Sequence, residues 1–197
     1  MALTESTMML DLGADAPDFT LRDVVSGKTV SRDDFRVQKG LLVMFICTHC
    51  PYVKHIENGL AAIGNDYAGR IGIVAISSND AVMYPDDDPE GLKEQAQRVG
   101  FRFPYLYDES QQVAQAYKAA CTPDFFLFDK SHTLVYRGQL DDSRPSGRGL
   151  GGGQAPNGKD LRAALDAVLA GKPVSPTQKA SIGCNIKWKP GNEPDYA

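Results

Sequence analysis

Two cysteines three residues apart, Cys47 and Cys50, are the residues whose types and spacing most directly suggest chemistry. A thiolate is a strong nucleophile, and two thiols at this spacing around a tight turn can come within disulfide range. Pro51 follows Cys50 and suits the first position of a helix, because its missing N–H is no loss there. We therefore predict that Cys50 is a helix N-cap, where free backbone N–H groups and the helix dipole favour a thiolate.

Two basic side chains strengthen this prediction. His49 precedes Cys50 directly, and Lys54 follows one helical turn later. If positively charged, both would lower the pKa of the Cys50 thiol. Our hypothesis is that Cys50 is a nucleophilic thiol and that Cys47 is its disulfide partner.

Other interpretations of the two cysteines remain open. Both could be buried apolar side chains, because cysteine is often fully buried. They could also be half of a metal site completed by a histidine and a fourth ligand. The candidate further ligands are His49, His55, Cys121 and Cys184. This spacing resembles no zinc module known to us, so we expect no metal and no other cofactor.

Composition restricts the class of protein. The chain has 197 residues, enough for one domain with extra loops or tails, and a net charge of −4 without a long basic run. Nucleic acid and membrane surfaces are therefore not expected partners. The N-terminus has no basic region and no apolar stretch approaches the length of a membrane span, so we expect a cytoplasmic protein. Cysteines in a reducing compartment are more often redox-active or catalytic than structural.

Hydrophobic periodicity predicts alternating strands and helices between residues 13 and 171. Residues 1–12 read as a flexible lead and residues 172–197 as a C-terminal extension. Strands are expected over 19–31 as a hairpin, then over 41–46, 71–77, 103–108, 121–129 and 134–140. Helices are expected over 51–67, 90–99, 111–119 and 160–170. The acidic run 86–88 is expected to be a solvated surface and helix N-terminus rather than a metal site.

The chain resembles a known family. The order of its elements is similar to the thioredoxin fold, and Thr122-Pro123 resembles the cis-proline element that faces the thiols there. Residues 13–50, with Ala16-Pro17-Asp18-Phe19, resemble the redoxin branch, the alkyl hydroperoxide reductase/thiol-specific antioxidant (AhpC/TSA) group. Residues 49–55 and 181–188 are similar to the peroxiredoxin-like 1 group of bacterial redoxins.

The resemblance implies an α/β fold, with a central mixed β-sheet flanked by helices, an N-terminal β-hairpin and a C-terminal tail. It also reveals departures. By this resemblance, Val53 stands where thioredoxin has its second cysteine, and Met44 stands where thioredoxin has its buried aspartate. Peroxiredoxins carry a proline and a threonine or serine where this chain has Val43 and Cys47.

These features favour thiol–disulfide exchange. Thr122 would offer backbone groups to an extended protein or small-molecule disulfide, and a thiol such as thioredoxin or glutathione would be the reductant. The alternative is a thiol peroxidase in which a hydroperoxide oxidises Cys50, Cys47 resolves the sulfenic acid, and Arg137 or Arg144 stabilises the developing charge. Cys121 is expected to be a buried side chain rather than an accessory thiol. Cys184 is a possible accessory thiol: if the tail packs back on the domain through Ile186 and Trp188, it would bring Cys184 to the active site as a resolving thiol.

Overall fold

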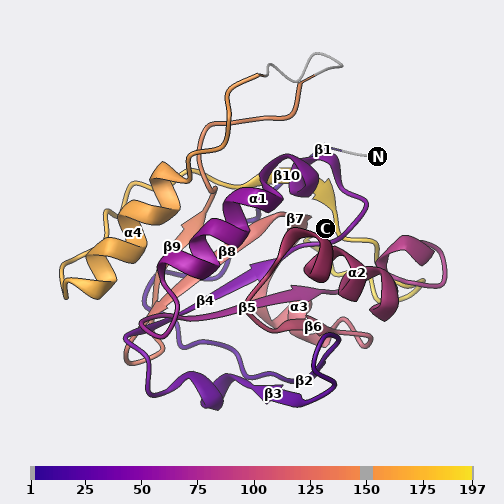
Figure 1. The fold of residues 1–197 in the computed structure, drawn as a ribbon, viewed down its shortest axis with the longest axis horizontal. Helices are drawn as coiled ribbons and strands as arrows, with labels where there is room; N and C mark the ends of the chain where they lie inside the picture. Colours follow the sequence, from indigo (N-terminus) through magenta and orange to yellow (C-terminus); the bar gives the residue numbers. More distant parts are fainter. Residues whose placement is uncertain (1–2, 147–152, 197) are drawn as a thin grey trace.

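The computed structural model describes residues 3–146 and 153–196. Its main sheet has seven strands in the order β3-β2-β6-β5-β4-β8-β9 (Figure 1). These strands are β2 (Thr20–Asp23), β3 (Thr29–Ser31), β4 (Gly40–Phe45), β5 (Gly72–Ser77), β6 (Tyr105–Tyr107), β8 (Asp124–Asp129) and β9 (Leu134–Gly138). The β4–β5 and β5–β6 pairs are parallel and the other pairs are antiparallel, which confirms the predicted mixed sheet.

Helices cover both faces of this sheet (Figure 1). They are α1 (Pro51–Asp66), α2 (Pro89–Val99), α3 (Gln112–Tyr117) and α4 (Lys159–Leu169), with short 3-10 turns η1 (Arg32–Phe35) and η2 (Pro85–Asp87). Leu42 and Met44 of β4 pack in the core with α1, α2 and α4, whereas Leu41 and Val43 pack in the core with α3. Because both faces of β4 are buried, its sequence is apolar throughout.

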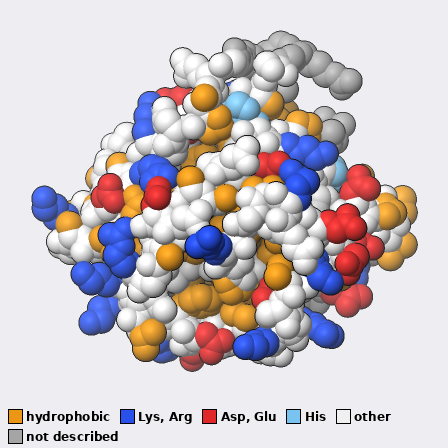
Figure 2. Space-filling model, in the orientation of Figure 1, with side chains coloured by type: hydrophobic (Ala, Val, Ile, Leu, Met, Phe, Trp, Pro, Cys, Tyr) orange, Lys and Arg blue, Asp and Glu red, His pale blue; other side chains and the backbone are white. Residues whose placement is uncertain are grey.

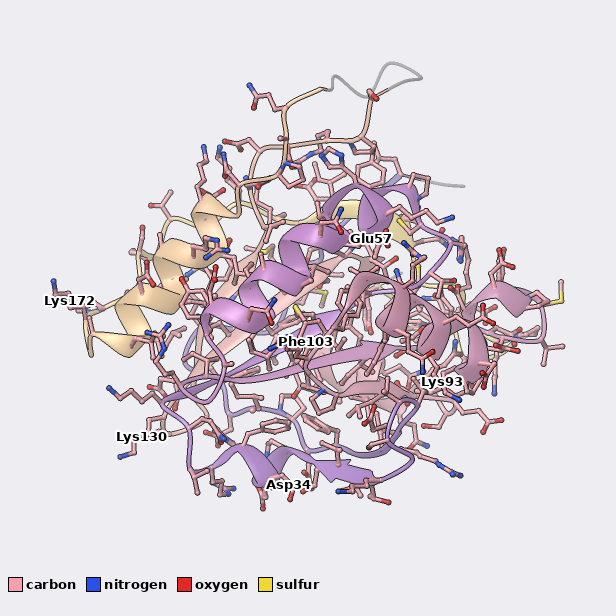
Figure 3. All side chains as sticks on the ribbon, in the orientation of Figure 1. Asp34, Glu57, Lys93, Phe103, Lys130 and Lys172 are labelled. Carbon is pink, nitrogen blue, oxygen red and sulfur yellow. The ribbon has the colours of Figure 1, made fainter. Side chains whose placement is uncertain are left out.

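Close packing holds α1 against the layer beneath it. The ring of Phe103 lies against Gly64, where an added Cβ would be 2.7 Å from the ring. Figure 3 shows Phe103 in the interior, with Asp34, Lys130 and Lys172 at the rim. The helix that carries Cys50 at its N-terminus is therefore fixed along its length by buried contacts.

A second, three-stranded sheet ties the ends of the chain to the domain. β10 (Ile182–Asn185) pairs antiparallel with β1 (Leu3–Glu5) on one edge and with β7 (Cys121–Thr122) on the other. The flexible lead predicted for residues 1–12 thus contains a strand, although residues 1–2 lie outside the described part. The composition of residues 3–5 does not predict a strand. They form one because their backbone groups make hydrogen bonds with β10.

The strand predicted over residues 121–129 is divided into β7 and β8 at Pro123, whose peptide bond with Thr122 is cis. Proline has no N–H for a ladder, so the break at this residue has a simple cause. The divided strand lets Thr122 pair with the small sheet while Asp124 pairs with β4 in the main sheet.

The surface carries charges of both signs, which intermingle on the face shown in Figure 2. No helix among residues 3–146 and 153–196 is long and apolar enough to cross a membrane.

Candidate active site

Cys50 is the N-cap of α1, as predicted. Its backbone is extended, with φ −68° and ψ 123°, and Pro51 occupies the first helical turn. Ile46 follows the end of β4, so Cys47 lies in the short loop between that strand and α1. This loop brings both cysteines to the carboxyl end of a central strand, the edge at which ligands bind in open α/β sheets.

Three thiols and one threonine meet at this point. The Sγ atom of Cys50 lies 2.8 Å from the Sγ of Cys184 and 3.2 Å from the carbonyl oxygen of Thr122. The Sγ of Cys47 lies 3.3 Å from the hydroxyl oxygen of Thr122. Cys47 and Cys50 have no exposed surface and Cys184 is 4% exposed. The structure therefore assembles a buried thiol cluster with a third cysteine from the C-terminal extension.

Burial alone would raise the pKa of the Cys50 thiol, but hydrogen bonds lower it well below its ordinary value. The thiols of Cys184 and Cys47 act most strongly, followed by the backbone N–H groups of Val53 and Cys184. These contacts, rather than His49 and Lys54, are the chief groups that favour the thiolate. Lys54 is exposed, so water screens its charge.

The two thiols beside Cys50 have the opposite tendency. Burial, followed by the hydrogen bond with Cys50, raises the pKa of Cys47 well above its ordinary value. The hydrogen bond with Cys50, followed by burial, raises the pKa of Cys184. Of the three thiols, Cys50 is therefore the one that ionises most readily, and its neighbours Cys47 and Cys184 favour the protonated form.

A buried aspartate organises the loop that holds the thiols. Asp87 Oδ1 accepts hydrogen bonds from the backbone N–H of Thr48, at 2.8 Å, and from its hydroxyl, at 2.7 Å. Its Oδ2 accepts from Asn79 Nδ2 at 2.7 Å and lies 2.5 Å from His49 Nδ1. Burial would raise the pKa of Asp87, but these hydrogen bonds, that of His49 first, lower it to about 2.

The prediction that the acidic run 86–88 is entirely a solvated surface and helix N-terminus is therefore wrong at Asp87. Asp86 is exposed and Asp88 is the N-cap of α2, as expected, but Asp87 is fully buried. Residues 86–88 are all aspartates, and the backbone conformation of the turn η2 determines that Asp87 is the one that is buried. No sequence signal distinguishes Asp87 from its neighbours.

Possible metal-ligating atoms also gather here. Cys47, His49 and Asp87 each offer one atom, and these atoms lie within 4.8 Å of one another. This set differs from the ligand sets considered from the sequence, because it contains a carboxylate and lacks Cys50. Both Asp87 oxygens already accept hydrogen bonds from the loop and from Asn79, so the arrangement has a structural explanation.

Some predicted residues lie away from the reacting sulfurs. Cys121 is buried, and its thiol donates to the carbonyl oxygen of Pro123 at 3.6 Å, in keeping with the expectation of a buried side chain. Arg137 on β9 donates to the carbonyl oxygen of Leu10.

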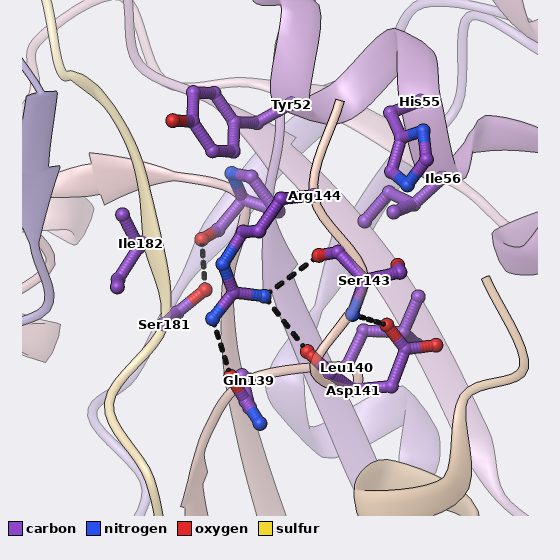
Figure 4. Close-up of a pocket in the computed structure, with 11 residues that line it drawn as sticks. Tyr52, His55, Ile56, Gln139, Leu140, Asp141, Ser143, Arg144, Ser181 and Ile182 are labelled. Carbon is purple, nitrogen blue, oxygen red and sulfur yellow. Dashed lines mark hydrogen bonds between the residues drawn. The ribbon is translucent and has the colours of Figure 1, made fainter. Parts of the chain in front are cut away.

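Arg144 lies in a different place from Arg137. With His55, Tyr52 and Pro123 it lines a small cavity of about 20 Å³ (Figure 4). The Arg144 guanidinium donates to the Gln139 side chain and to loop carbonyl groups, as the dashed lines show. Tyr52 and Pro123 line this cavity and follow Cys50 and Thr122 closely in the chain, so the cavity lies near the elements that carry the thiols, although none of its lining residues is a cysteine.

Comparison with known proteins places this site in a family. Residues 12–137 match the model of the AhpC/TSA family. The chain belongs to this family. It is 51% identical to an uncharacterized conserved protein from Geobacillus kaustophilus, with a TM-score of 0.89 over 97% of this chain and 98% of that one.

Two further comparisons involve proteins named for thiol chemistry. The chain is 29% identical over 132 residues to the thiol-disulfide oxidoreductase ResA of Geobacillus thermodenitrificans (strain NG80-2), covering 65% of this chain and 68% of ResA. The thioredoxin domain of a thiol-disulfide oxidoreductase from Bacteroides vulgatus is 22% identical, with a TM-score of 0.55 over 65% of this chain and 88% of that domain. The latter similarity confirms the predicted thioredoxin-like fold.

Proposed function

We propose that this protein is a thiol–disulfide oxidoreductase that works through the Cys47/Cys50 dithiol, with Cys50 as the nucleophile. One observation carries the proposal: the Cys50 sulfur lies at the N-terminus of α1, where hydrogen bonds from thiols and backbone N–H groups favour its thiolate. Family membership makes the chain an oxidoreductase, and its similarity to ResA supports the disulfide as substrate.

The reaction follows from the order of the thiol pKa values. The Cys50 thiolate attacks one sulfur of a disulfide, a mixed disulfide forms, and the other sulfur leaves and takes up a proton. Cys47 then loses its proton and attacks the Cys50 sulfur. The second substrate thiol leaves, and a Cys47–Cys50 disulfide remains. An outside thiol, such as reduced thioredoxin or glutathione, restores the dithiol by the same exchange.

Cys47 must lose its proton before it can attack, although its pKa is raised. A ring nitrogen of His49 and a carboxylate oxygen of Asp87 lie within 4.8 Å of its sulfur. His49 Nδ1 is held by Asp87, while Nε2 has no hydrogen-bond partner among the described residues. We assign His49 the role of accepting the Cys47 proton, with Asp87 as its positioning residue. This pair replaces the acceptor that Met44, a buried core residue, cannot provide.

The test compares single variants in the reduction of oxidised glutathione and of a protein disulfide. Cys50→Ser should abolish turnover. Cys47→Ser combined with Cys184→Ser, which also removes the other thiol in contact with Cys50, should stop at a mixed disulfide between Cys50 and the substrate, detected by mass spectrometry. Cys121→Ala is the matched control, because Cys121 is a buried cysteine that takes no part in the mechanism. Normal turnover by this double variant would refute the assignment of Cys47 as partner.

A thiol peroxidase is a second candidate, supported by the burial of the nucleophile. Cys50 has no exposed surface, and the cavity beside the cluster holds about 20 Å³, enough for a molecule near the size of water. A molecule as small as hydrogen peroxide needs a much smaller opening to reach the buried Cys50 than a protein disulfide does. Peroxide would convert Cys50 to a sulfenic acid, and Cys47 would resolve it with release of water. Peroxide consumption slower than disulfide exchange on the reduced protein would reject this candidate.

The finer assignments stay predictions. Membership of the peroxiredoxin-like 1 group, an antioxidant role and a cytoplasmic location are proposed from the sequence alone. Fractionation of cells that produce this protein, with antibody detection, would test the location.

A further inference from the structure

The strand β10 lies on the edge that a disulfide substrate would use. It pairs antiparallel with β7, and Cys184 stands opposite Thr122, the residue before Pro123. An extended substrate is expected to use the backbone groups of this same Thr122, because a sheet edge binds extended chains through its main chain. The C-terminal segment thus occupies the expected substrate position.

The register of this pairing places a sulfur where a substrate sulfur would have to be. Cys184 Sγ lies 2.8 Å from Cys50 Sγ, and the backbone N–H of Cys184 also favours the Cys50 thiolate. The residue before Cys184 is Gly183, and the close approach of the two strands explains why it has no side chain. A Cβ on Gly183 would lie 2.0 Å from the carbonyl oxygen of Thr122, so only glycine permits this close approach.

The segment is also fastened at both ends. Ser181 Oγ donates to the carbonyl oxygen of Pro123 at 2.5 Å, and Ile186 N–H donates to the carbonyl oxygen of Ala120 at 2.9 Å. Lys187 continues the attachment, because its N–H donates to Asn79 Oδ1 at 2.8 Å. With the segment in place Cys50 has no exposed surface, so a disulfide of another protein cannot reach it.

We propose that the segment Ser181–Lys187 is an internal substrate, whose Cys184 exchanges with Cys50 and which must leave the Thr122 edge before an outside disulfide binds. This inference rests on the proposed function of Cys50 and adds a third redox-active thiol. The segment competes with outside disulfides for the Thr122 edge. When it returns to that edge, its Cys184 is a second disulfide partner for Cys50, besides Cys47.

The exchange balances without a further reactant. An outside disulfide first forms a mixed disulfide with Cys50 and releases one thiol. Cys184 then attacks the Cys50 sulfur as the segment returns, its proton passes to the departing substrate sulfur, and a Cys50–Cys184 disulfide forms. Attack by Cys47 on the Cys50 sulfur breaks that bond, returns a proton to Cys184 and leaves the Cys47–Cys50 disulfide.

The first test locates the disulfide. The reduced full-length protein is oxidised with oxidised glutathione, the remaining thiols are blocked with iodoacetamide, and peptides are mapped by mass spectrometry. We expect a Cys50–Cys184 peptide in the unmodified protein and a larger share of it in Cys47→Ser. Absence of that peptide from both proteins would overturn the inference.

The second test opens the segment without touching a thiol. Gly183→Ala places a methyl group against Thr122 and should raise the rate of Cys50 alkylation by iodoacetamide by about tenfold or more, since local opening limits access to a buried thiol. Gly59→Ala in α1 is the matched control, because a Cβ there meets atoms only at 3.9 Å. Equal alkylation rates in Gly183→Ala and the control, with native circular dichroism in both, would contradict the inference.

Failure of this inference can be told from failure of the proposed function. Turnover of outside disulfides through Cys47–Cys50, with Cys184 never linked, would retain the function and reject the internal substrate. A Cys50–Cys184 disulfide in a protein that reduces no outside disulfide would support the internal exchange and reject the proposed function.

Discussion

Replacement of Cys184 by alanine should raise the pKa of Cys50 toward that of an ordinary thiol. Among the groups that lower this pKa, the Cys184 thiol has the largest effect, and its sulfur lies 2.8 Å from that of Cys50. Alanine cannot donate a hydrogen bond from its side chain, whereas serine can. Cys184→Ala should therefore destabilise the thiolate more than Cys184→Ser does.

The expected magnitude follows from the strength of the lost contact. A hydrogen bond to a charged group contributes about 1.5–3 kcal/mol, so its loss should weaken the acidity of Cys50 about 10- to 150-fold. The contacts from Cys47 and from the backbone of Val53 remain and keep the thiol more acidic than a free cysteine.

Because folding lowers the pKa of Cys50, its thiolate contributes its full stabilisation of the fold at pH values above the pKa of the unfolded thiol. That stability is lost as pH falls toward the folded value.

The assay is a pH titration of the ultraviolet absorbance of the thiolate on fully reduced protein. Cys47 and Cys121 have raised pKa values, so the signal that persists in acid belongs to Cys50. Cys50→Ser supplies the baseline. We expect the signal of the unmodified protein to persist until acid unfolding, that of Cys184→Ala to disappear at higher pH, and that of Cys184→Ser to lie between them. Coincident curves for the three proteins would refute the reasoning, because the Cys184 contact would then have no influence on the thiolate.

Three further predictions concern Asp87, His49 and Asp124. Asp87→Asn should destabilise the protein by about 3 kcal/mol, because a buried ionic partner is lost, and lower the Tm by roughly 6–12 °C, whereas Asp86→Asn at the exposed neighbour should leave the Tm unchanged in calorimetry. His49→Ala should slow the release of the mixed disulfide without changing its formation, and equal slowing of both steps in stopped-flow kinetics would contradict its role toward Cys47. Burial raises the pKa of Asp124 to about 8, so the folded protein keeps this proton while the unfolded chain loses it, and stability falls as pH rises from about 4 to 8. In Asp124→Asn, the Tm should therefore decline less over that range, and parallel Tm curves would exclude this cost.

Local chemistry made the centre of the site predictable. Pro51 after Cys50 predicted the N-cap correctly, because the preference of proline for the first helical turn depends only on its own ring and missing N–H. The apolar run of β4 likewise predicted a strand buried on both faces. The N-cap and the buried strand are each determined by a few consecutive residues, so a sequence pattern can predict them.

Contacts between distant segments were not predictable in the same way. Asp87 reaches Thr48 across 39 positions, a contact that no periodic signal marks. The contact of Cys184 with Cys50 across 134 positions was a minor alternative based on the apolar Ile186 and Trp188 of the tail, and the sequence could not decide it. The contact of the His49 imidazole with Asp87 was likewise not visible in the sequence, which placed His49 only beside Cys50. Contacts between residues far apart in the sequence depend on the whole fold, whereas secondary-structure propensity describes only the local chain.

Thr122 relates these distant contacts to one another. Its hydroxyl oxygen contacts Cys47, its carbonyl oxygen contacts Cys50, and it stands opposite Cys184 in the β10–β7 pair. A rearrangement at this one residue therefore affects all three thiols. With the segment Ser181–Lys187 in place, Cys184 and Cys47 both contact Cys50 and compete for its sulfur. With the segment displaced only Cys47 remains, so the position of one short strand determines which disulfide forms.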